Sequence, residues 1–391
     1  MDHHKAATGS NSESRNMGLD VLRATAILMV FLFHEISMKH IPLLGQFGTG
    51  VDLFFVLSGF LIGRIYFRTT KAHTFSLAGF WVARWWRTLP PYLAGLLLYI
   101  AVGHISSYAA QQPPLHWYYL GFLQNYLGLD AWGPTWSLCV EEQFYLSLPL
   151  VAFVIDRWLG RSTFRYLLPT VFFVPLVLRI ILMSYAALPY RWYWMTHLHC
   201  EAMIAGLWLA YLFVEERTRF DRLQKKSVWL LPIIPATMLI LPVLKGPMPD
   251  MVLFTLLAIG YAAWLSFCYG LVWEPKGRFL RIARWSIQHV ALCAYSIYLT
   301  HTTVDPTFRG LAGSVLHLHK GMVNTSLVIV ATLLVGIAFY HLVERPSIRT
   351  RDLYRSRRRL AEGTKPSTEP VGQAVLQTHE VFELNPAVSP E

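Results

Sequence analysis

A small set of ionisable residues lies within or beside long apolar runs, where a charged group is costly and usually functional. The set comprises Arg23, His34, Asp52, Arg84, Arg87, Glu141 and Glu142. Neutral imidazole can accept a proton or attack an electrophile near neutral pH, carboxylates can orient an imidazole, and paired arginines can bind phosphate. These residue types suit the transfer of a group from a phosphate-bearing donor.

Arg23 and His34 lie toward opposite ends of the first apolar run. Eleven positions separate them, which is close to three helical turns, so both side chains project from one helix face, roughly 16 Å apart along the axis. We expect this face to line a cavity. The alternative is that Arg23 extends to the lipid headgroups and His34 is an interfacial histidine with its own hydrogen-bond partners.

Asp52 lies at the start of the second apolar run. It could orient or charge-balance His34 across a helix pair, because an ionised group at a bilayer needs a partner. Asp is also favoured at a helix N-terminus, where backbone N–H groups and the helix dipole stabilise it, and the two readings are compatible. Gly59 and Gly63 in the same run allow close helix packing.

Arg84 and Arg87 precede the third apolar run. Their i, i+3 spacing puts them on one helix face, where they could clamp a phosphate or diphosphate. The alternative is ordinary basic flanking of a membrane span on its cytoplasmic side. The sequence leaves both readings open.

Glu141 and Glu142 are adjacent carboxylates at the start of the fourth apolar run. They point about 100° apart on a helix, so one could face a cavity while the other pairs with a basic residue. The alternative is an acidic cap at the membrane interface. A later histidine, His301, is expected to be structural rather than catalytic.

Aromatic residues gather in the loops on the opposite side of the membrane from these basic flanks. They could form a platform for sugar rings, or they could be the aromatic belt of a membrane protein. The loop residues concerned are Trp117, Tyr118, Tyr119, Trp132, Arg191, Trp192, Tyr193, Trp194, His197 and His199.

The elements that must position these side chains are membrane-spanning helices. Of the 391 residues, 54% are hydrophobic and 15% are charged, against about 25% charged in a soluble domain. Several apolar runs are close to the roughly 20 residues that span a bilayer. They predict an all-α polytopic protein of about ten spans, of which the second, fourth and ninth are expected to be short or broken. The runs are 19–37, 48–67, 89–107, 136–155, 164–186, 198–214, 228–244, 251–272, 289–303 and 322–343.

Lysine and arginine fall mainly in alternate connections, within residues 64–87, 157–165, 217–226 and 276–284. Basic loops stay on the cytoplasmic side, which predicts that both termini are cytoplasmic. The net charge of +11 is therefore spread over loops and does not form a nucleic-acid-binding face. The four cysteines lack ligand spacing, so we expect buried thiols, with neither disulfides nor a metal site.

Three regions follow from this pattern. Residues 1–17 are expected to be a flexible cytoplasmic N-terminus, 18–349 the transmembrane domain, and 350–391 a disordered tail. The tail opens with clustered arginines, which should contact anionic membrane lipids.

Several motifs in fixed order together resemble the acyltransferase-3 family of multispanning membrane acyltransferases, which includes bacterial O-antigen and exopolysaccharide O-acetylases. The carriers of the resemblance are Arg23 with His34, the run Gly50 to Ile62, Arg84-x-x-Arg87, Trp136-Ser137-Leu138, Glu141 to Tyr145, Tyr295 to His301, and Glu344-Arg345-Pro346.

The resemblance implies a multi-pass enzyme of the inner (cytoplasmic) membrane. Its donor would be cytoplasmic acyl-CoA, usually acetyl-CoA, acting as co-substrate, with no tightly bound cofactor. The acceptor would be a hydroxyl of a glycan or lipid-linked saccharide, or in some members a small natural product such as a macrolide. His34 matches the family's essential histidine, Arg23 its first-span arginine, and Arg84 with Arg87 its paired arginines.

Thioester chemistry needs a base for the acceptor hydroxyl and a way to hold the CoA phosphates. We expect His34 to be that base, or a transient acyl acceptor, with Asp52 or Glu141 orienting it. Arg84 and Arg87 would hold the phosphates. Arg23 would stabilise negative charge on the donor or on its carbonyl oxygen.

Family members often continue into an extracytoplasmic SGNH-type domain, and this sequence ends without one. On this resemblance we expect the protein either to act alone or to pass the acyl group to a separate extracytoplasmic protein. A proton-coupled transporter is the competing class, because intramembrane Arg, His and Asp also mark ion pathways. An inverted repeat would favour it, and the sequence has none.

Overall fold

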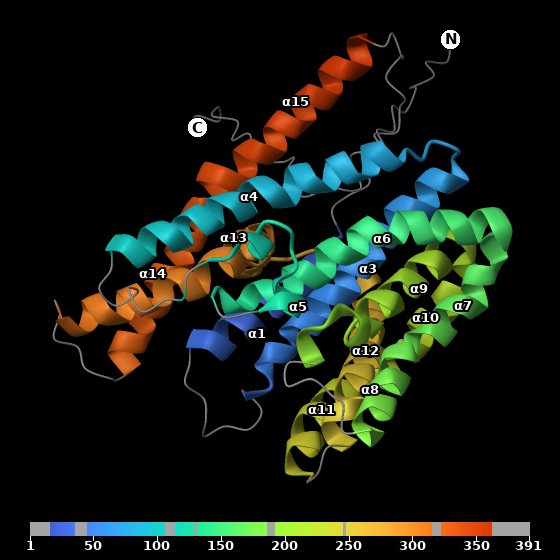
Figure 1. The fold of residues 1–391 in the computed structure, drawn as a ribbon, viewed down its shortest axis with the longest axis horizontal. Coiled ribbons are helices and arrows are strands. Elements are labelled where there is room, and N and C mark those ends of the chain that lie inside the picture. Colours follow the sequence, from blue (N-terminus) through green and yellow to red (C-terminus); the bar gives the residue numbers. More distant parts are fainter. Residues whose placement is uncertain are drawn as a thin grey trace.

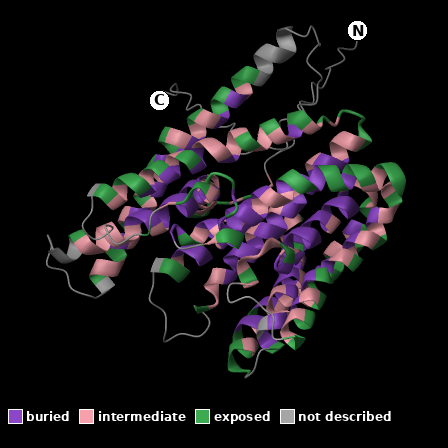
Figure 2. Ribbon diagram, viewed as in Figure 1, coloured by how far each residue is buried: buried purple, intermediate pink, exposed green. Residues whose placement is uncertain are grey.

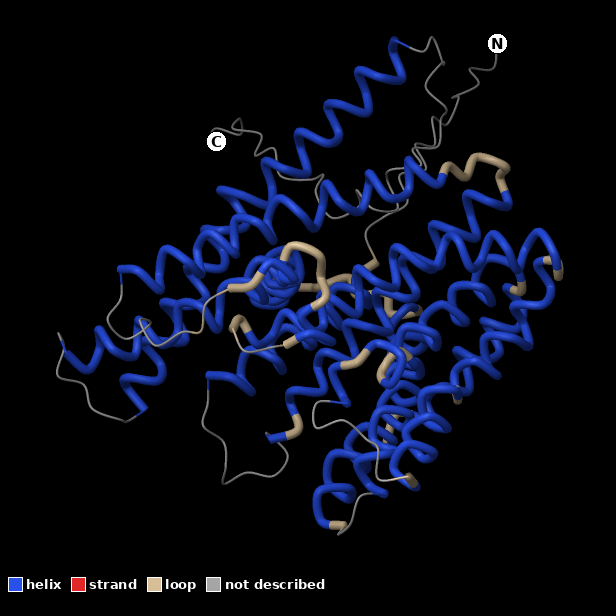
Figure 3. Tube along the Cα trace, in the orientation of Figure 1, coloured by secondary structure: helices blue, strands red, loops and turns tan. Residues whose placement is uncertain are grey.

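The computed structural model describes residues 16–35, 45–105, 113, 115–128, 131–185, 192–244, 248–314 and 322–361. These residues form helices and connecting loops, without a strand among them (Figure 3). The helices are α1 (Met17–Glu35), α3 (Gly50–Lys71), α4 (Leu77–Ile105), α5 (Gln124–Leu127), α6 (Trp136–Trp158), α7 (Phe164–Phe172), α8 (Val174–Ser184), α9 (Glu201–Glu215), α10 (Arg217–Lys226), α11 (Ile233–Ile240), α12 (Met248–Tyr269), α13 (Arg278–Ser314), α14 (Met322–Phe339) and α15 (Arg345–Ala361). A π-helical turn, Tyr340–Glu344, joins α14 to α15.

Within the described residues, seven helical segments are long and apolar enough to cross a bilayer. The prediction of an all-α polytopic membrane protein is confirmed. The count of ten spans and the cytoplasmic location of both termini remain predictions.

The expected interruptions fall at other places. The second, fourth and ninth apolar runs are continuous helices, α3, α6 and α13. The fifth run instead breaks at Phe173 between α7 and α8, and in the seventh α11 begins only after Pro232. A proline lies beside each break: Pro175 at the start of α8 and Pro232 directly before α11. Proline has no backbone N–H, which a helix interior requires.

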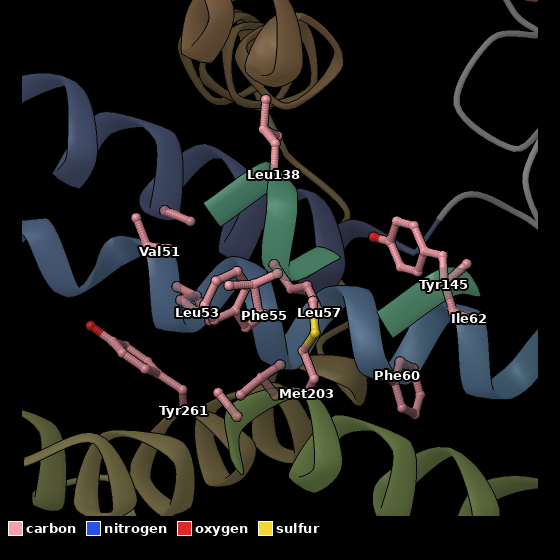
Figure 4. Packing of buried hydrophobic residues seen from close by; sticks show 14 of the residues in the cluster. Val51, Leu53, Phe55, Leu57, Phe60, Ile62, Leu138, Tyr145, Met203 and Tyr261 are labelled. Carbon is pink, nitrogen blue, oxygen red and sulfur yellow. The ribbon is translucent and has the colours of Figure 1, made fainter. Parts of the chain in front are cut away.

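Close packing explains the glycines of α3. A Cβ at Gly59 would lie 2.1 Å from the Met203 carbonyl oxygen on α9, and one at Gly206 would lie 2.1 Å from the Val56 carbonyl oxygen on α3. The two helices approach to backbone contact because neither has a side chain there. This contact is the centre of the buried core, where Leu57 and Met203 meet (Figures 2 and 4).

The remaining helices surround this pair. α1 packs against α3 and α13, and α13 packs against α14. α4 and α15 lie side by side along one edge of the molecule (Figure 1), where the Ser347 hydroxyl donates to the Trp86 carbonyl oxygen at 2.9 Å. The domain boundary predicted at residue 349 therefore falls inside α15, which continues the fold instead of beginning a disordered tail. Residues 1–15 and 362–391 lie outside the described residues.

Candidate active site

His34 lies in the last turn of α1, beside His301 of α13. The Nδ1 atom of His34 lies 2.8 Å from the Val30 carbonyl oxygen and 3.4 Å from Nε2 of His301. The His301 ring is fully buried, and its own Nδ1 lies 2.8 Å from the Tyr298 carbonyl oxygen. His34 is exposed. The buried ring of His301 therefore holds the accessible ring of His34 in place.

These contacts assign the protons on the two neutral rings. A carbonyl oxygen only accepts hydrogen bonds, so the Nδ1 atom of His301 carries a proton and its Nε2 does not. The Nδ1 atom of His34 faces a carbonyl and this bare nitrogen, so it also carries its proton. The Nε2 atom of His34 is then unprotonated, and it has no hydrogen-bond partner among the described residues. It is free to accept a proton or attack an electrophile.

Arg84 and Arg87 lie within α4, because the helix begins well before the predicted span. Ser76 caps it, accepting a hydrogen bond from the Gly79 N–H at 3.2 Å. The two arginines are thus held on a rigid helix, one turn apart. The Arg84 guanidinium covers the Tyr145 ring at 4.2 Å from its centroid.

The two adjacent glutamates of α6 face different neighbours. Glu141 accepts hydrogen bonds from Ser58 on α3 at 2.8 Å and from Tyr145 at 3.0 Å. Glu142 is buried and interacts with Thr88 and Arg84 on α4. The structure does not bring Glu141 to His34, whose contacts are Val30 and His301, so a direct orienting contact is absent among the described residues.

Arg87 interacts electrostatically with three other arginines and one carboxylate: Arg23, Arg84, Arg351 and Glu344. We call Arg23, Arg84, Arg87 and Arg351 the arginine cluster. Glu344 belongs to the π-helical turn, a feature frequent at functional sites, and accepts a hydrogen bond from Ser296 of α13 at 2.6 Å. Arg23 pairs with Asp20 at 3.1 Å.

The arginine cluster and the histidine pair lie at different levels along α1, which carries Arg23 of the cluster and His34 of the pair. α13 contacts both levels, through Ser296, which binds Glu344, and through His301 five residues further on. The distance from Arg23 to His34 along the α1 axis is roughly 16 Å. A donor whose charged end lies at the arginine cluster must be long to reach His34.

Asp52 does not orient His34. It is buried and accepts a hydrogen bond from Nε2 of His199 at 2.8 Å, while Nδ1 of His199 lies 2.6 Å from the Tyr193 carbonyl oxygen. It is not the N-cap of α3 either, because that position is Thr49. The Asp52 side chain thus contacts the loop before α9, whereas the contacts of His34 are Val30 and His301.

A fully buried ion pair lies next to this contact and was missed from the sequence. Arg179 of α8 donates to Glu201 of α9 at 2.7 Å, to Thr255 of α12 at 3.0 Å and to two backbone carbonyls. We call Asp52, His199, Arg179, Glu201 and Thr255 the loop network. The signal was present, since Arg179 interrupts the apolar run 164–186.

The aromatic loops are only partly exposed. Tyr119, Trp132 and His199 are buried, whereas Trp117 is 71% exposed. His197 stacks on Tyr126, with its Nδ1 atom 2.9 Å from the Tyr126 hydroxyl. Arg191 lies outside the described residues. A platform of all ten predicted residues is therefore excluded, and a smaller exposed set remains.

The four cysteines are free thiols. Among the described residues, no three His, Cys, Asp or Glu side chains are grouped as metal ligands.

The helices and these polar clusters define a multi-pass membrane protein with an accessible histidine and a group of arginines, of which Arg351 is buried and the other three are partly buried. The chain belongs to the acyltransferase-3 family, whose profile, described as an acyltransferase domain, matches residues 16–341. It is similar to the O-acetyltransferase OatA of Staphylococcus aureus strains NCTC 8325 / PS 47 and COL, with 31% identity over 239 residues. The alignment covers 56% of this chain and 38% of each relative, so the chain spans well under half of their length. No solved structure matches the chain.

The membrane-spanning helices and this family match together define a membrane protein that carries an acyltransferase domain.

Proposed function

We propose that this protein transfers an acetyl group from acetyl-CoA, bound from the cytoplasmic side, to a hydroxyl group of a cell-envelope glycan at the cytoplasmic membrane. The observation that carries the proposal is the state of His34: its Nδ1 atom is engaged and its Nε2 atom is bare and accessible. A base that is already in the correct tautomer needs no rearrangement before it takes a proton.

The reaction uses His34 as general base. Its Nε2 atom takes the proton of the acceptor hydroxyl while the hydroxyl oxygen bonds to the thioester carbon. The carbon–sulfur bond of the tetrahedral intermediate then breaks, and the CoA thiolate leaves and takes the proton from the imidazolium. His301 acts as a positioning residue, since its bare Nε2 atom and the Val30 carbonyl fix the His34 ring.

The arginine cluster supplies the donor site in this proposal. Arginine binds phosphate through parallel N–H groups, and the cluster lies about three helical turns from His34 along α1. The extended pantetheine arm of CoA has a comparable length, so the phosphates would lie at the arginines while the thioester reaches the histidine. Arg23 would then act on the charged end of the donor, not on its carbonyl.

The acceptor proposal rests on the relatives, which are named O-acetyltransferases, and on exposed aromatic side chains in the loops. Trp117, Tyr193 and His197 combine ring faces with hydrogen-bonding groups, a surface suited to a sugar.

The test is acetyl transfer from radiolabelled acetyl-CoA in membranes that contain the wild-type protein or His34→Gln. Glutamine keeps the polarity and approximate size of the side chain but is not a base, so we expect a loss of at least about a hundredfold in turnover. Release of free CoA, measured with a thiol reagent, gives a second readout that a transporter would not produce.

Equal protein levels and equal melting temperatures of the two variants are the control. Undiminished transfer by a folded His34→Gln protein would show that another group is the base. Comparing the masses of surface glycans from a deletion strain and its parent would identify the acceptor.

A further inference from the structure

The last helix brings a fourth arginine to the cluster. Arg351 of α15 is 1% exposed, which is exceptional for arginine, a residue that is almost never fully buried unless paired. Its Nε atom donates to the neighbouring Asp352 at 2.8 Å. Its Nη1 atom is buried and has no hydrogen-bond partner within the described part of the chain.

Pro90 within α4 leaves a backbone carbonyl open, and α15 binds to it. Pro90 has no N–H, so the Trp86 carbonyl four residues earlier loses its helical donor. The Ser347 hydroxyl of α15 fills that role at 2.9 Å. Ser347 and Arg351 are four residues apart and therefore lie on one face of α15, so the contact at Trp86 turns Arg351 toward the α4 residues on either side of it.

Those residues are Arg84 and Arg87. Arg351 interacts electrostatically with Arg87, which in turn interacts with Arg84. The Nε atom of Arg84 is also buried without a hydrogen-bond partner among the described residues. Two of the three guanidinium groups thus hold an unused N–H in the interior. An unpaired buried donor costs about 1–3 kcal/mol, and more when it is charged, so an anion with several acceptor oxygens would satisfy this site.

We propose that Arg351, with Arg84 and Arg87, forms a three-arginine clamp for the phosphate-bearing end of CoA. This inference rests on the proposed function, because it takes acyl-CoA as the donor. It adds that α15 is part of the donor site, so the segment after the last apolar run completes the enzyme instead of merely following it.

The test uses the full-length protein in nanodiscs of net-neutral lipid, with binding of radiolabelled acetyl-CoA as the measurement. Arg351→Met should weaken the affinity about tenfold, equivalent to about 1.4 kcal/mol. Arg351→Lys should lose less, because it keeps the charge and loses only the planar fork. Arg349→Met is the matched control: Arg349 lies on the same helix but is exposed, and its loss should leave affinity within twofold.

A second probe separates binding from folding. In the wild type, 3′,5′-ADP, which carries phosphates but no pantetheine arm, should compete with acetyl-CoA, and in Arg351→Met it should compete about tenfold less well. Pantetheine, which carries no phosphate, should compete equally with both proteins. An equal loss for pantetheine would show a general structural defect and overturn the clamp.

The outcomes also separate this inference from the proposed function. If the wild type binds no acetyl-CoA, the donor proposal and the clamp both fail. If the wild type binds acetyl-CoA and Arg351→Met binds it with unchanged affinity, the donor proposal stands and the clamp alone is overturned.

Discussion

Two buried arginines in this protein have opposite surroundings. Arg179 is fully buried in the loop network, and each of its three guanidinium nitrogens has an acceptor: Glu201, Thr255 or a backbone carbonyl. Arg351 is equally buried in the arginine cluster, yet its Nη1 atom has no partner among the described residues and its neighbours include other arginines.

The difference separates structure from ligand binding. A buried charge that is fully hydrogen-bonded holds its elements together, because removing it leaves a partner unpaired. A buried charge with an unused donor contributes little to the fold as it stands and becomes favourable when an anion arrives. By this criterion, the loop network fixes α8, α9 and α12, and the arginine cluster is built for a ligand.

The largest expected effect tests the structural side of this comparison. Arg179→Met leaves Glu201 buried without its cation, which should lower the free energy of unfolding by about 3–5 kcal/mol. Thermal unfolding of the purified protein in detergent measures this. Arg351→Met, in the absence of donor, should cost much less.

A compensating variant sharpens the result. Arg179→Met combined with Glu201→Gln removes both charges and should regain part of the lost stability. If Arg351→Met destabilised the donor-free protein as much as Arg179→Met does, the distinction between the two arginines would be lost.

The next effect concerns the histidine pair near the other end of α1. His301→Leu removes the acceptor that helps to hold the His34 ring but keeps a side chain of comparable volume. We expect turnover to fall about tenfold, equivalent to about 1.4 kcal/mol in the barrier, with an unchanged KM for acetyl-CoA. Steady-state kinetics on the folded variant measures both constants.

His301→Ala provides a contrast, because it leaves a cavity beside His34 and should lower both stability and turnover. A rise in KM for acetyl-CoA without a fall in turnover would show that His301 acts in donor binding and not in positioning His34.

The sequence predicted the elements of this protein better than it predicted their contacts. Apolar runs locate helices because bilayer thickness fixes the length of a span, and ordered motifs such as Arg84-x-x-Arg87 predicted the family correctly. Contacts between distant helices depend on rotation and packing, which single runs do not encode. Asp52 was therefore assigned to His34 in the adjacent helix, when its partner is His199, 147 positions away.

Two further omissions have physical causes. Arg179 was overlooked because a single charge does not change the mean hydropathy of a long apolar run, although a lone arginine in such a run demands a partner. Arg351 was assigned to a disordered tail because its neighbours are also arginines. The contact between Ser347 and the Trp86 carbonyl, which Pro90 leaves without a helical donor, turns Arg351 toward α4. This contact distinguishes Arg351 from the neighbouring arginines.

The smallest expected effect tests the separation of the loop network from the reaction. Asp52→Asn keeps an amide oxygen that can accept the hydrogen bond from His199 and loses only the charge that strengthens it. We expect the free energy of unfolding to fall by about 1 kcal/mol, measured as a lower melting temperature, while turnover per folded molecule stays within twofold. Asp52→Ala, which leaves the buried His199 nitrogen unpaired, should destabilise more and still spare the turnover of the folded fraction. If instead Asp52→Asn abolished turnover without changing the melting temperature, Asp52 and His199 would belong to the catalytic machinery. The presence or absence of unused arginine donors would then no longer distinguish the two networks.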